Sequence, residues 1–163
     1  MIRVIRGNIV ELDVDVIVNS AHPTLMAGSG VCGAIHAAAG PMLEPVVKKL
    51  GPLEPGNAVT TESYNLNASH IIHAVAPRYL RKTTEEELQL QETYKASMKE
   101  FQKLDNAKTI AFPSMGTGIY GWPLDLAAKI AAETLSSYPN AEIIICAFDA
   151  NTKAAYLSAI ENH

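Results

Sequence analysis

The sequence has few of the features that mark secreted, membrane or nucleic-acid-binding proteins. Its 163 residues include only two cysteines, Cys32 and Cys146, which excludes a disulfide scaffold and favours a reduced, cytoplasmic protein. No apolar run approaches the roughly 20 residues that span a bilayer, and residues 1–6 do not resemble a signal peptide. The 13 lysines and arginines are outnumbered by 17 acidic residues. The net charge of −4 therefore offers no basic surface for a nucleic-acid backbone.

Metal-site patterns are also missing. None of the five histidines has zinc-site spacing with a cysteine pair. His70 and His73 are three residues apart in a predicted strand, so their side chains point to opposite faces. We interpret His73 and Cys146 as core residues. The sequence predicts neither a metal nor a cofactor.

What is present is an alternation of strand and helix patterns, which is typical of an α/β fold. Predicted strands cover residues 2–5, 15–19, 58–62, 71–76, 109–112 and 142–146. Predicted helices cover 33–39, the segment after Pro41 to about 50, 84–104, 123–137 and 153–161. No linker or repeat divides the chain. We expect one domain over residues 1–163, with a mixed, mainly parallel sheet covered by helices on both faces.

Two stretches without any charged residue, 16–40 and 109–124, contain four and three glycines. Each includes a loop, residues 21–30 and 113–122, that leaves a predicted strand and runs into a helix. Backbone N–H groups at such turns and helix starts can hold phosphate without a cationic side chain. The lack of lysine excludes a P-loop. Two adjacent loops of this kind suit a diphosphate, and the alternative is that they are ordinary tight turns.

Motifs along nearly the whole chain resemble the macrodomain (Appr-1″-p processing) family. They are Gly7-Asn-Ile9, the run from Val14 to Met26 containing Val-Asp-Val-Ile-Val-Asn-Ser-Ala-His, Gly28-Ser-Gly-Val-Cys-Gly-Ala-Ile-His36, Ile71 to Pro77, and Ala111 to Pro123. The pattern is similar to that of bacterial O-acetyl-ADP-ribose deacetylases and mono-ADP-ribosyl hydrolases. This resemblance implies a three-layer α/β/α macrodomain that binds ADP-ribose in a cleft over the sheet.

The resemblance also implies which residues form the site. Adenine is expected near Asn8 and Ile9, with Phe148 against its face. The other implied ligand-binding residues are Gly30 and Val31 on one side, and Ser114, Gly116, Thr117, Gly118, Ile119 and Tyr120 on the other. The implied catalytic residues are Asn19, His22 and Cys32. Tyr120 is expected against the distal ribose, and we interpret Trp122 as a packing residue, with a place on the cleft rim as the alternative.

Four positions depart from the family pattern. Asn8 replaces an Asp whose carboxylate accepts hydrogen bonds from the adenine amino group, which softens adenine selectivity. His22 replaces an Asn that faces the distal ribose, and an imidazole can either hold a ribose hydroxyl or act as a general base. Cys32 replaces an Asp linked to hydrolysis, and His36 one turn later allows a nucleophilic thiol as a minor alternative. Alphavirus macrodomains, regarded as hydrolases, also carry Gly-Val-Cys. Gly116 replaces a Ser of the phosphate loop.

Two function classes follow from the resemblance. The first is a hydrolase that acts at the distal ribose of ADP-ribose conjugates, either O-acetyl-ADP-ribose or mono-ADP-ribosylated protein carboxylates. The second is a reader module that binds ADP-ribose without turnover, and slow ADP-ribose 1″-phosphatase activity is a third possibility. The expected partners are ADP-ribose and ADP-ribosylated proteins or metabolites, with no nucleic acid and no membrane.

Overall fold

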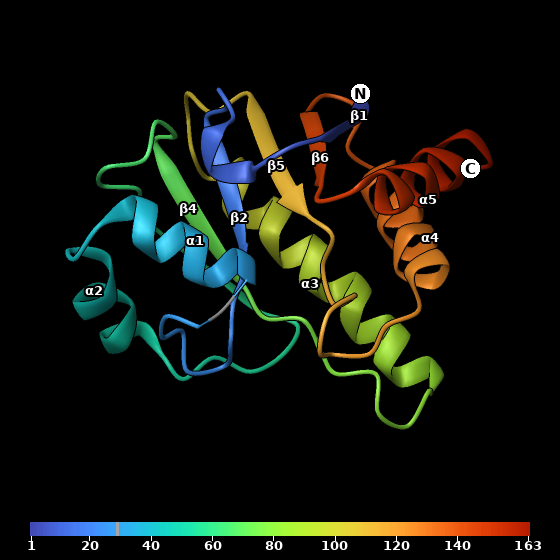
Figure 1. The fold of residues 1–163 in the computed structure, drawn as a ribbon, viewed down its shortest axis with the longest axis horizontal. Helices are drawn as coiled ribbons and strands as arrows, with labels where there is room; N and C mark the ends of the chain where they lie inside the picture. Colours follow the sequence, from blue (N-terminus) through green and yellow to red (C-terminus); the bar gives the residue numbers. More distant parts are fainter. Residues whose placement is uncertain (29) are drawn as a thin grey trace.

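A computed structural model describes residues 1–28 and 30–163 of the chain. Its centre is a six-stranded sheet with the order β1-β6-β5-β2-β4-β3 (Figure 1). The strands are β1 (Ile2–Arg6), β2 (Val16–Ser20), β3 (Ala58–Glu62), β4 (His70–Ala74), β5 (Thr109–Pro113) and β6 (Glu142–Ala147). Only β3 pairs antiparallel, with β4 at one edge, among the described strands. The predicted mixed, mainly parallel sheet is confirmed.

Helices cover both faces of this sheet (Figure 1). The elements on one face are α1 (Gly30–Ala39), α2 (Leu43–Leu50) and the short 3-10 helix η1 (Ile9–Glu11); those on the other are α3 (Thr84–Gln102), α4 (Leu124–Leu135) and α5 (Ala150–Glu161). Val16 and Val18 of β2 pack into the core under α3 and α4, whereas Ile17 packs under α1. A strand buried on both faces needs consecutive apolar residues, as the sequence has here. The three-layer α/β/α fold is confirmed.

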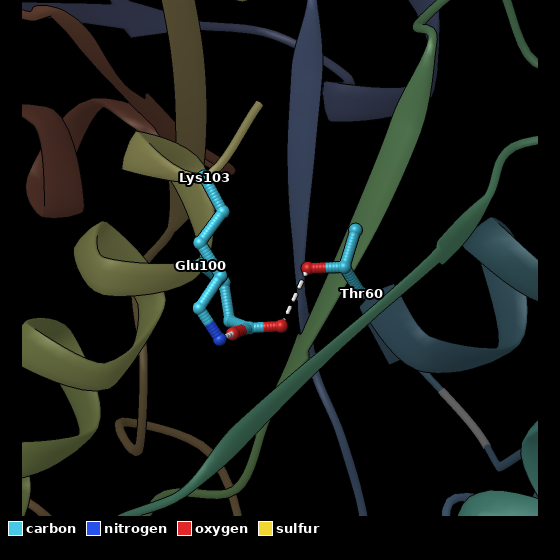
Figure 2. Close-up of polar contacts among 3 residues, drawn as sticks. All are labelled: Thr60, Glu100 and Lys103. Carbon is cyan, nitrogen blue, oxygen red and sulfur yellow. Dashed lines mark hydrogen bonds and ion pairs between the residues drawn. The ribbon is translucent and has the colours of Figure 1, made fainter. Parts of the chain in front are cut away.

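Helix α3 is capped at its start and is bonded to the sheet near its end. Its first turn has a complete capping box, in which Thr83 accepts from the backbone of Glu86 and the Glu86 side chain accepts from the backbone of Thr83. Near its other end, Glu100 accepts hydrogen bonds from Thr60 of β3 at 2.9 Å and from Lys103 at 2.6 Å (Figure 2). Burial raises the pKa of Glu100, but these hydrogen bonds outweigh it and lower the pKa overall.

Asp15 joins the starts of β2 and β5. Its Oδ2 accepts hydrogen bonds from the backbone N–H groups of Lys108 at 2.7 Å and Thr109 at 3.0 Å. The hydrogen bond from Lys108 contributes most to lowering the pKa of Asp15, and burial opposes it. The carboxylate therefore sets the register of the two strands whose carboxyl ends form the site described below.

We predict that Asp15→Ala lowers the free energy of unfolding at neutral pH by about 1–2 kcal/mol, because two charge-assisted hydrogen bonds are lost. A lowered pKa in the folded state stabilises fully above the ordinary carboxyl pKa, and less as the pH falls toward the lowered value. Urea unfolding of both proteins between neutral and acidic pH measures this difference. It should shrink in acid, and a difference that does not change with pH would contradict the assignment.

Several element boundaries differ from those predicted. Helix α1 begins at Gly30 and not at residue 33, because Gly30 starts it with a φ of +61° that glycine tolerates. Helix α5 begins at Ala150 and not at residue 153, since Asp149 caps it by accepting from the Thr152 N–H. Strand β4 ends at Ala74, two residues early. The helix η1 was not predicted at all.

Within the described part of the chain, no helix combines the length and the apolar character needed to cross a membrane.

Candidate functional site

A cleft of about 390 Å³ opens at the carboxyl ends of β2 and β5, where two loops leave the sheet for helices α1 and α4. It is lined by Ser20, His22, Gly28, Gly30, Val31, Cys32, Pro113, Ser114, Gly116, Gly118, Ile119 and Tyr120. None of these lining residues is Lys, Arg, Asp or Glu. Any anion in the cleft is therefore held by backbone groups and neutral side chains.

One wall of the cleft is the N-terminus of α1. Gly30, Val31 and Cys32 form the first turn of this helix, and first-turn N–H groups have no intrahelical acceptor. They and the helix dipole favour a negative charge at this end. Gly33 lets the preceding loop approach, because a Cβ there would lie 2.4 Å from the carbonyl oxygen of Gly28. This wall is thus a backbone-built anion site.

The opposite wall is the loop between β5 and α4. Trp122 donates from its backbone N–H to the Gly116 carbonyl at 3.1 Å and from Nε1 to the Pro77 carbonyl at 2.8 Å. Gly116 has a φ of +81°, and a Cβ there would lie 2.6 Å from the indole ring. Only glycine leaves room for the Trp122 ring at position 116, which explains the absence of a serine there. Trp122 also stacks on Tyr79, so its predicted packing role is confirmed.

Ser114 links the start of this loop to the buried core through hydroxyl contacts. Its Oγ lies 2.9 Å from both the Thr117 hydroxyl and the buried Tyr156 hydroxyl. Thr117 is turned into this network and does not line the cleft, although it belongs to the predicted phosphate loop. Gly118 has open space around its missing Cβ, and Ile119 is 92% exposed. The loop is held firmly at its base and presents a small residue to the cleft.

His22 lies in the cleft wall with its ring orientation and tautomer fixed. Nδ1 accepts from the Thr24 backbone N–H at 3.2 Å and lies 3.0 Å from the Thr24 hydroxyl. That hydroxyl also accepts from the Met26 N–H at 3.3 Å. Because the Thr24 N–H makes Nδ1 an acceptor, the proton of the neutral imidazole is placed on Nε2. The free nitrogen is then a hydrogen-bond donor, which favours the ribose-holding interpretation of His22 over the general base.

Asn19 lies beneath the cleft and is fully buried. Its Nδ2 donates to Nδ1 of His73 at 3.1 Å and lies 3.6 Å from the Cys32 sulfur. His73 Nε2 in turn lies 2.9 Å from the Thr61 hydroxyl, which donates to the Glu62 carbonyl. Burial lowers the pKa of His73 to about 3, so it is neutral at physiological pH. The core interpretation of His73 is confirmed, and Asn19 lies next to Cys32 with its Oδ1 buried and without a partner among the described residues.

Cys32 has no bond to His36. Its sulfur is buried, lies 3.7 Å from the Met26 carbonyl oxygen, and is approached by the Asn19 amide. The ring nitrogen Nε2 of His36 is buried without a partner, and burial lowers the pKa of this histidine. The pairing needed for a nucleophilic thiol is not formed.

The residues predicted to hold adenine lie outside this cleft, at the neighbouring strands. Asn8 and Ile9 follow β1, and Phe148 follows β6 with 86% of its surface exposed. Asn8 caps η1 by accepting from the Val10 N–H at 3.2 Å, and the Ile9 side chain is buried. Because β1 and β6 are adjacent, these residues form one end of a surface that continues from the cleft.

The cleft thus gathers nine of the predicted site residues and leaves five outside its walls. The nine are His22, Gly30, Val31, Cys32, Ser114, Gly116, Gly118, Ile119 and Tyr120; the five are Asn8, Ile9, Asn19, Thr117 and Phe148. Three lining residues were not predicted as site residues: Ser20, Gly28 and Pro113. Each directly adjoins a predicted strand end or glycine run, and this position in the sequence could have indicated that they line the site. The described residues contain no group of three His, Cys, Asp or Glu side chains placed to hold a metal ion.

The Macro domain family model matches residues 18–131, which is more than half of the chain and includes both walls of the cleft. The chain belongs to the macro domain family. A relative from Klebsiella pneumoniae (strain 342), called O-acetyl-ADP-ribose deacetylase, is 41% identical over 163 residues, covering 94% of this chain and 93% of its own. A macro domain-containing protein of Caldanaerobacter subterraneus is 44% identical over 141 residues, covering 84% of this chain and 80% of its own.

Solved macrodomain structures agree with this fold along almost the whole chain. The Oceanobacillus iheyensis macrodomain with ADP superposes with a TM-score of 0.92 at 28% identity, covering 98% of this chain and 89% of that one. The Trypanosoma brucei macrodomain in complex with ADP-ribose gives 0.86 at 27% identity, covering 98% and 68%. Of this macrodomain's departures from the family pattern, His22, Cys32 and Gly116 line the cleft and Asn8 lies beside it.

Proposed function

We propose that this macrodomain binds ADP-ribose and hydrolyses esters at its distal ribose. The observation that carries the proposal is an uncharged cleft between the α1 N-terminus and the Gly116–Gly118 loop. Two facing sets of backbone N–H groups suit a diphosphate. The O-acetyl-ADP-ribose deacetylase name of relatives such as the one from Klebsiella pneumoniae supports an ester substrate.

The direction proposed for ADP-ribose follows from the family resemblance, which puts adenine by Asn8 and Phe148, and the sheet order supports it. Strands β1 and β6, which precede Asn8 and Phe148, are at one end of the cleft, and β2 and β4 are at the other. Adenine therefore lies over β1 and β6, against the exposed Phe148 ring, with Asn8 as a hydrogen-bond partner. The diphosphate lies between α1 and the β5–α4 loop. The distal ribose then lies by His22 and Tyr120, and burial raises the pKa of Tyr120 so that it remains a phenol.

Hydrolysis adds one water to the ester. The water attacks the carbonyl carbon, the bond from that carbon to the ribose oxygen breaks, and the products are a carboxylic acid and a free ribose hydroxyl. The Nε2–H of His22 donates a hydrogen bond that holds the ribose or the carbonyl oxygen. An oxygen of the diphosphate, bound alongside, is the acceptor for the proton of the attacking water. No metal or cofactor enters this scheme.

The test of this function is calorimetry combined with a turnover assay. ADP-ribose should bind with micromolar affinity, about −8 kcal/mol, and ADP more weakly because it lacks the distal ribose. Wild-type protein should release acetate from O-acetyl-ADP-ribose and free ADP-ribose from a glutamate-linked mono-ADP-ribosylated protein. No ADP-ribose binding at millimolar concentration would refute the proposal.

The second candidate function, a reader that binds without turnover, is favoured by Cys32. A buried thiol stands where the family pattern has a carboxylate, so the polar contact that a carboxylate would make to the reacting region is absent. The turnover assay separates the two functions, because a reader binds ADP-ribose and leaves both ester substrates intact.

We predict that Cys32→Ala keeps ADP-ribose binding and loses less than about tenfold in rate, or roughly 1.4 kcal/mol. The thiol's contacts are with Met26 and Asn19 of this chain, so its removal changes packing more than chemistry. Steady-state kinetics and alkylation with iodoacetamide measure this. Complete loss of turnover, with rapid alkylation that blocks the wild type, would identify a nucleophilic thiol instead.

At the adenine end, Asn8→Asp should tighten ADP-ribose binding by about 1 kcal/mol, because a carboxylate is a stronger acceptor than an amide. The same substitution keeps the cap on η1, since Asp also accepts from the Val10 N–H. Calorimetry with ADP-ribose gives the affinity. Ribose 5-phosphate, which lacks adenine, is the control ligand and should bind both proteins equally. Unchanged ADP-ribose affinity would mean that adenine is held elsewhere.

A further inference from the structure

Three of the chain's 13 basic residues fall within five positions of the segment between β4 and α3. They are Arg78, Arg81 and Lys82, and all three are exposed. In the described part of the chain none of them forms an ion pair, since the two pairs found there lie within α3 and its C-terminal cap. The segment 78–82 is therefore a basic surface whose charges are left unpaired, in a protein with a net charge of −4.

This segment is held in one conformation. The Glu86 carboxylate accepts from the backbone N–H groups of Leu80 at 3.0 Å and Arg81 at 3.1 Å, and from Thr83 at 3.0 Å. Glu86 thus binds the backbone and leaves the basic side chains free. The neighbouring Glu85 and Glu87 lie in the first turn of α3, where the helix dipole favours their charges. A loop fixed in this way presents its cations without a large ordering cost.

The segment borders the cleft at Tyr120. The Tyr79 N–H donates to the Tyr120 carbonyl at 2.9 Å, and the Arg78 guanidinium lies 5.5 Å from the centre of the Tyr120 ring. Figure 1 shows the chain between β4 and α3 passing beside the loop between β5 and α4. Because the segment follows β4, it lies at the opposite end of the cleft from Asn8 and Phe148.

Resting on the proposed function, we propose that the segment 78–82 binds the acidic flank of an ADP-ribosylated protein acceptor. The acceptor is attached at the distal ribose, and its chain must leave the cleft at this end. Arg81 and Lys82 pair with acidic residues beside the modified carboxylate, and Leu80, 73% exposed, offers an apolar contact. O-acetyl-ADP-ribose carries only an acetyl group there, so the segment selects protein conjugates over the metabolite.

The experiment compares two substrates and two matched variants. Arg81→Glu combined with Lys82→Glu reverses the basic surface and leaves the cleft residues unchanged. The control, Lys95→Glu combined with Lys99→Glu, makes the same charge change on exposed positions of α3, with Lys99 roughly 20 Å from the helix start at about 1.5 Å per residue. kcat/KM is measured for O-acetyl-ADP-ribose and for glutamate-linked ADP-ribosyl peptides with acidic or neutral flanks.

We expect the segment variant to lose about tenfold or more on the acidic-flanked peptide, while the neutral-flanked peptide and the metabolite change less than about twofold. The control variant should keep the wild-type kcat/KM for the acidic-flanked peptide. The preference of the wild type for the acidic-flanked over the neutral-flanked peptide should weaken as added salt screens the charges. Equal losses on all substrates, or no loss on the acidic peptide, would overturn the proposal.

Binding of a non-hydrolysable, amide-linked ADP-ribosyl peptide, measured by fluorescence anisotropy, tests the same surface without turnover. The acidic-flanked peptide should bind the wild type more tightly than free ADP-ribose does, and the segment variant should lose that advantage. If the wild type binds these peptides but hydrolyses none of the ester substrates, the proposed function is refuted and the docking surface is not. If the wild type binds the acidic and neutral peptides with equal affinity, the docking surface is refuted.

Discussion

Gly118→Val is expected to abolish ADP-ribose binding, with a loss of at least about a hundredfold, or more than roughly 2.7 kcal/mol. Gly118 lines the cleft, and apart from its chain neighbours no described residue has an atom within 4 Å of where its Cβ would be. A branched side chain there therefore extends into the space in which a phosphate approaches the backbone. The fold should therefore survive while the site is blocked.

The controls for this variant are a smaller substitution and a stability measurement. Gly118→Ala adds one methyl group and should cost less affinity than valine does. Thermal unfolding should show all three proteins within a few degrees of one another. By contrast, any side chain at Gly116 meets the Trp122 ring, so that position cannot separate binding from folding. Tight ADP-ribose binding by Gly118→Val would show that the diphosphate lies elsewhere.

His22→Ala should lower kcat for ester hydrolysis by about a hundredfold, which is the usual cost of removing one donor that stabilises developing charge. His22→Asn should retain turnover to within about fivefold, because an amide NH₂ replaces the Nε2–H as a donor. The reason is the hydrogen bond from the Thr24 N–H to Nδ1, which places the ring proton on Nε2. Steady-state kinetics of both variants measure the difference.

A general base at His22 would behave differently. Asn cannot take a proton from water, so His22→Asn would then be as slow as His22→Ala, and the wild-type rate would follow the ionisation of the imidazole. Thr24→Val is a useful companion, since it removes the hydroxyl that lies 3.0 Å from Nδ1 and keeps the backbone N–H. It should reduce the rate only slightly if the ring acts as a donor.

The sequence predicted the architecture because consecutive apolar residues and turn residues are local signals. Val16 to Val18 identify a strand buried on both faces, and the two charge-free loops at the ends of β2 and β5 do form the cleft walls. The start of α1 was missed because a glycine-rich run reads as a loop, although Gly30 begins the helix through a positive φ. The start of α5 follows from Asp149, whose side chain caps the helix so that it begins three residues before the predicted start.

Contacts between residues distant in the sequence could not be predicted. The need for glycine at position 116 comes from the Trp122 ring, which is fixed in place by Pro77 on another loop. The network from Cys32 through Asn19 to His73 joins α1, β2 and β4. No periodicity in the sequence encodes such contacts. They hold Asn19, which the family resemblance groups with the catalytic residues, between Cys32 and His73.

Acetate release from O-acetyl-ADP-ribose, measured for the wild-type protein beside Gly118→Val, separates an esterase from a reader. The wild type should hydrolyse the ester, whereas Gly118→Val should neither bind ADP-ribose nor release acetate while remaining folded. If the wild type binds ADP-ribose but releases no acetate, while His22→Asn combined with Cys32→Asp does release it, the protein is a reader of ADP-ribose and not an esterase.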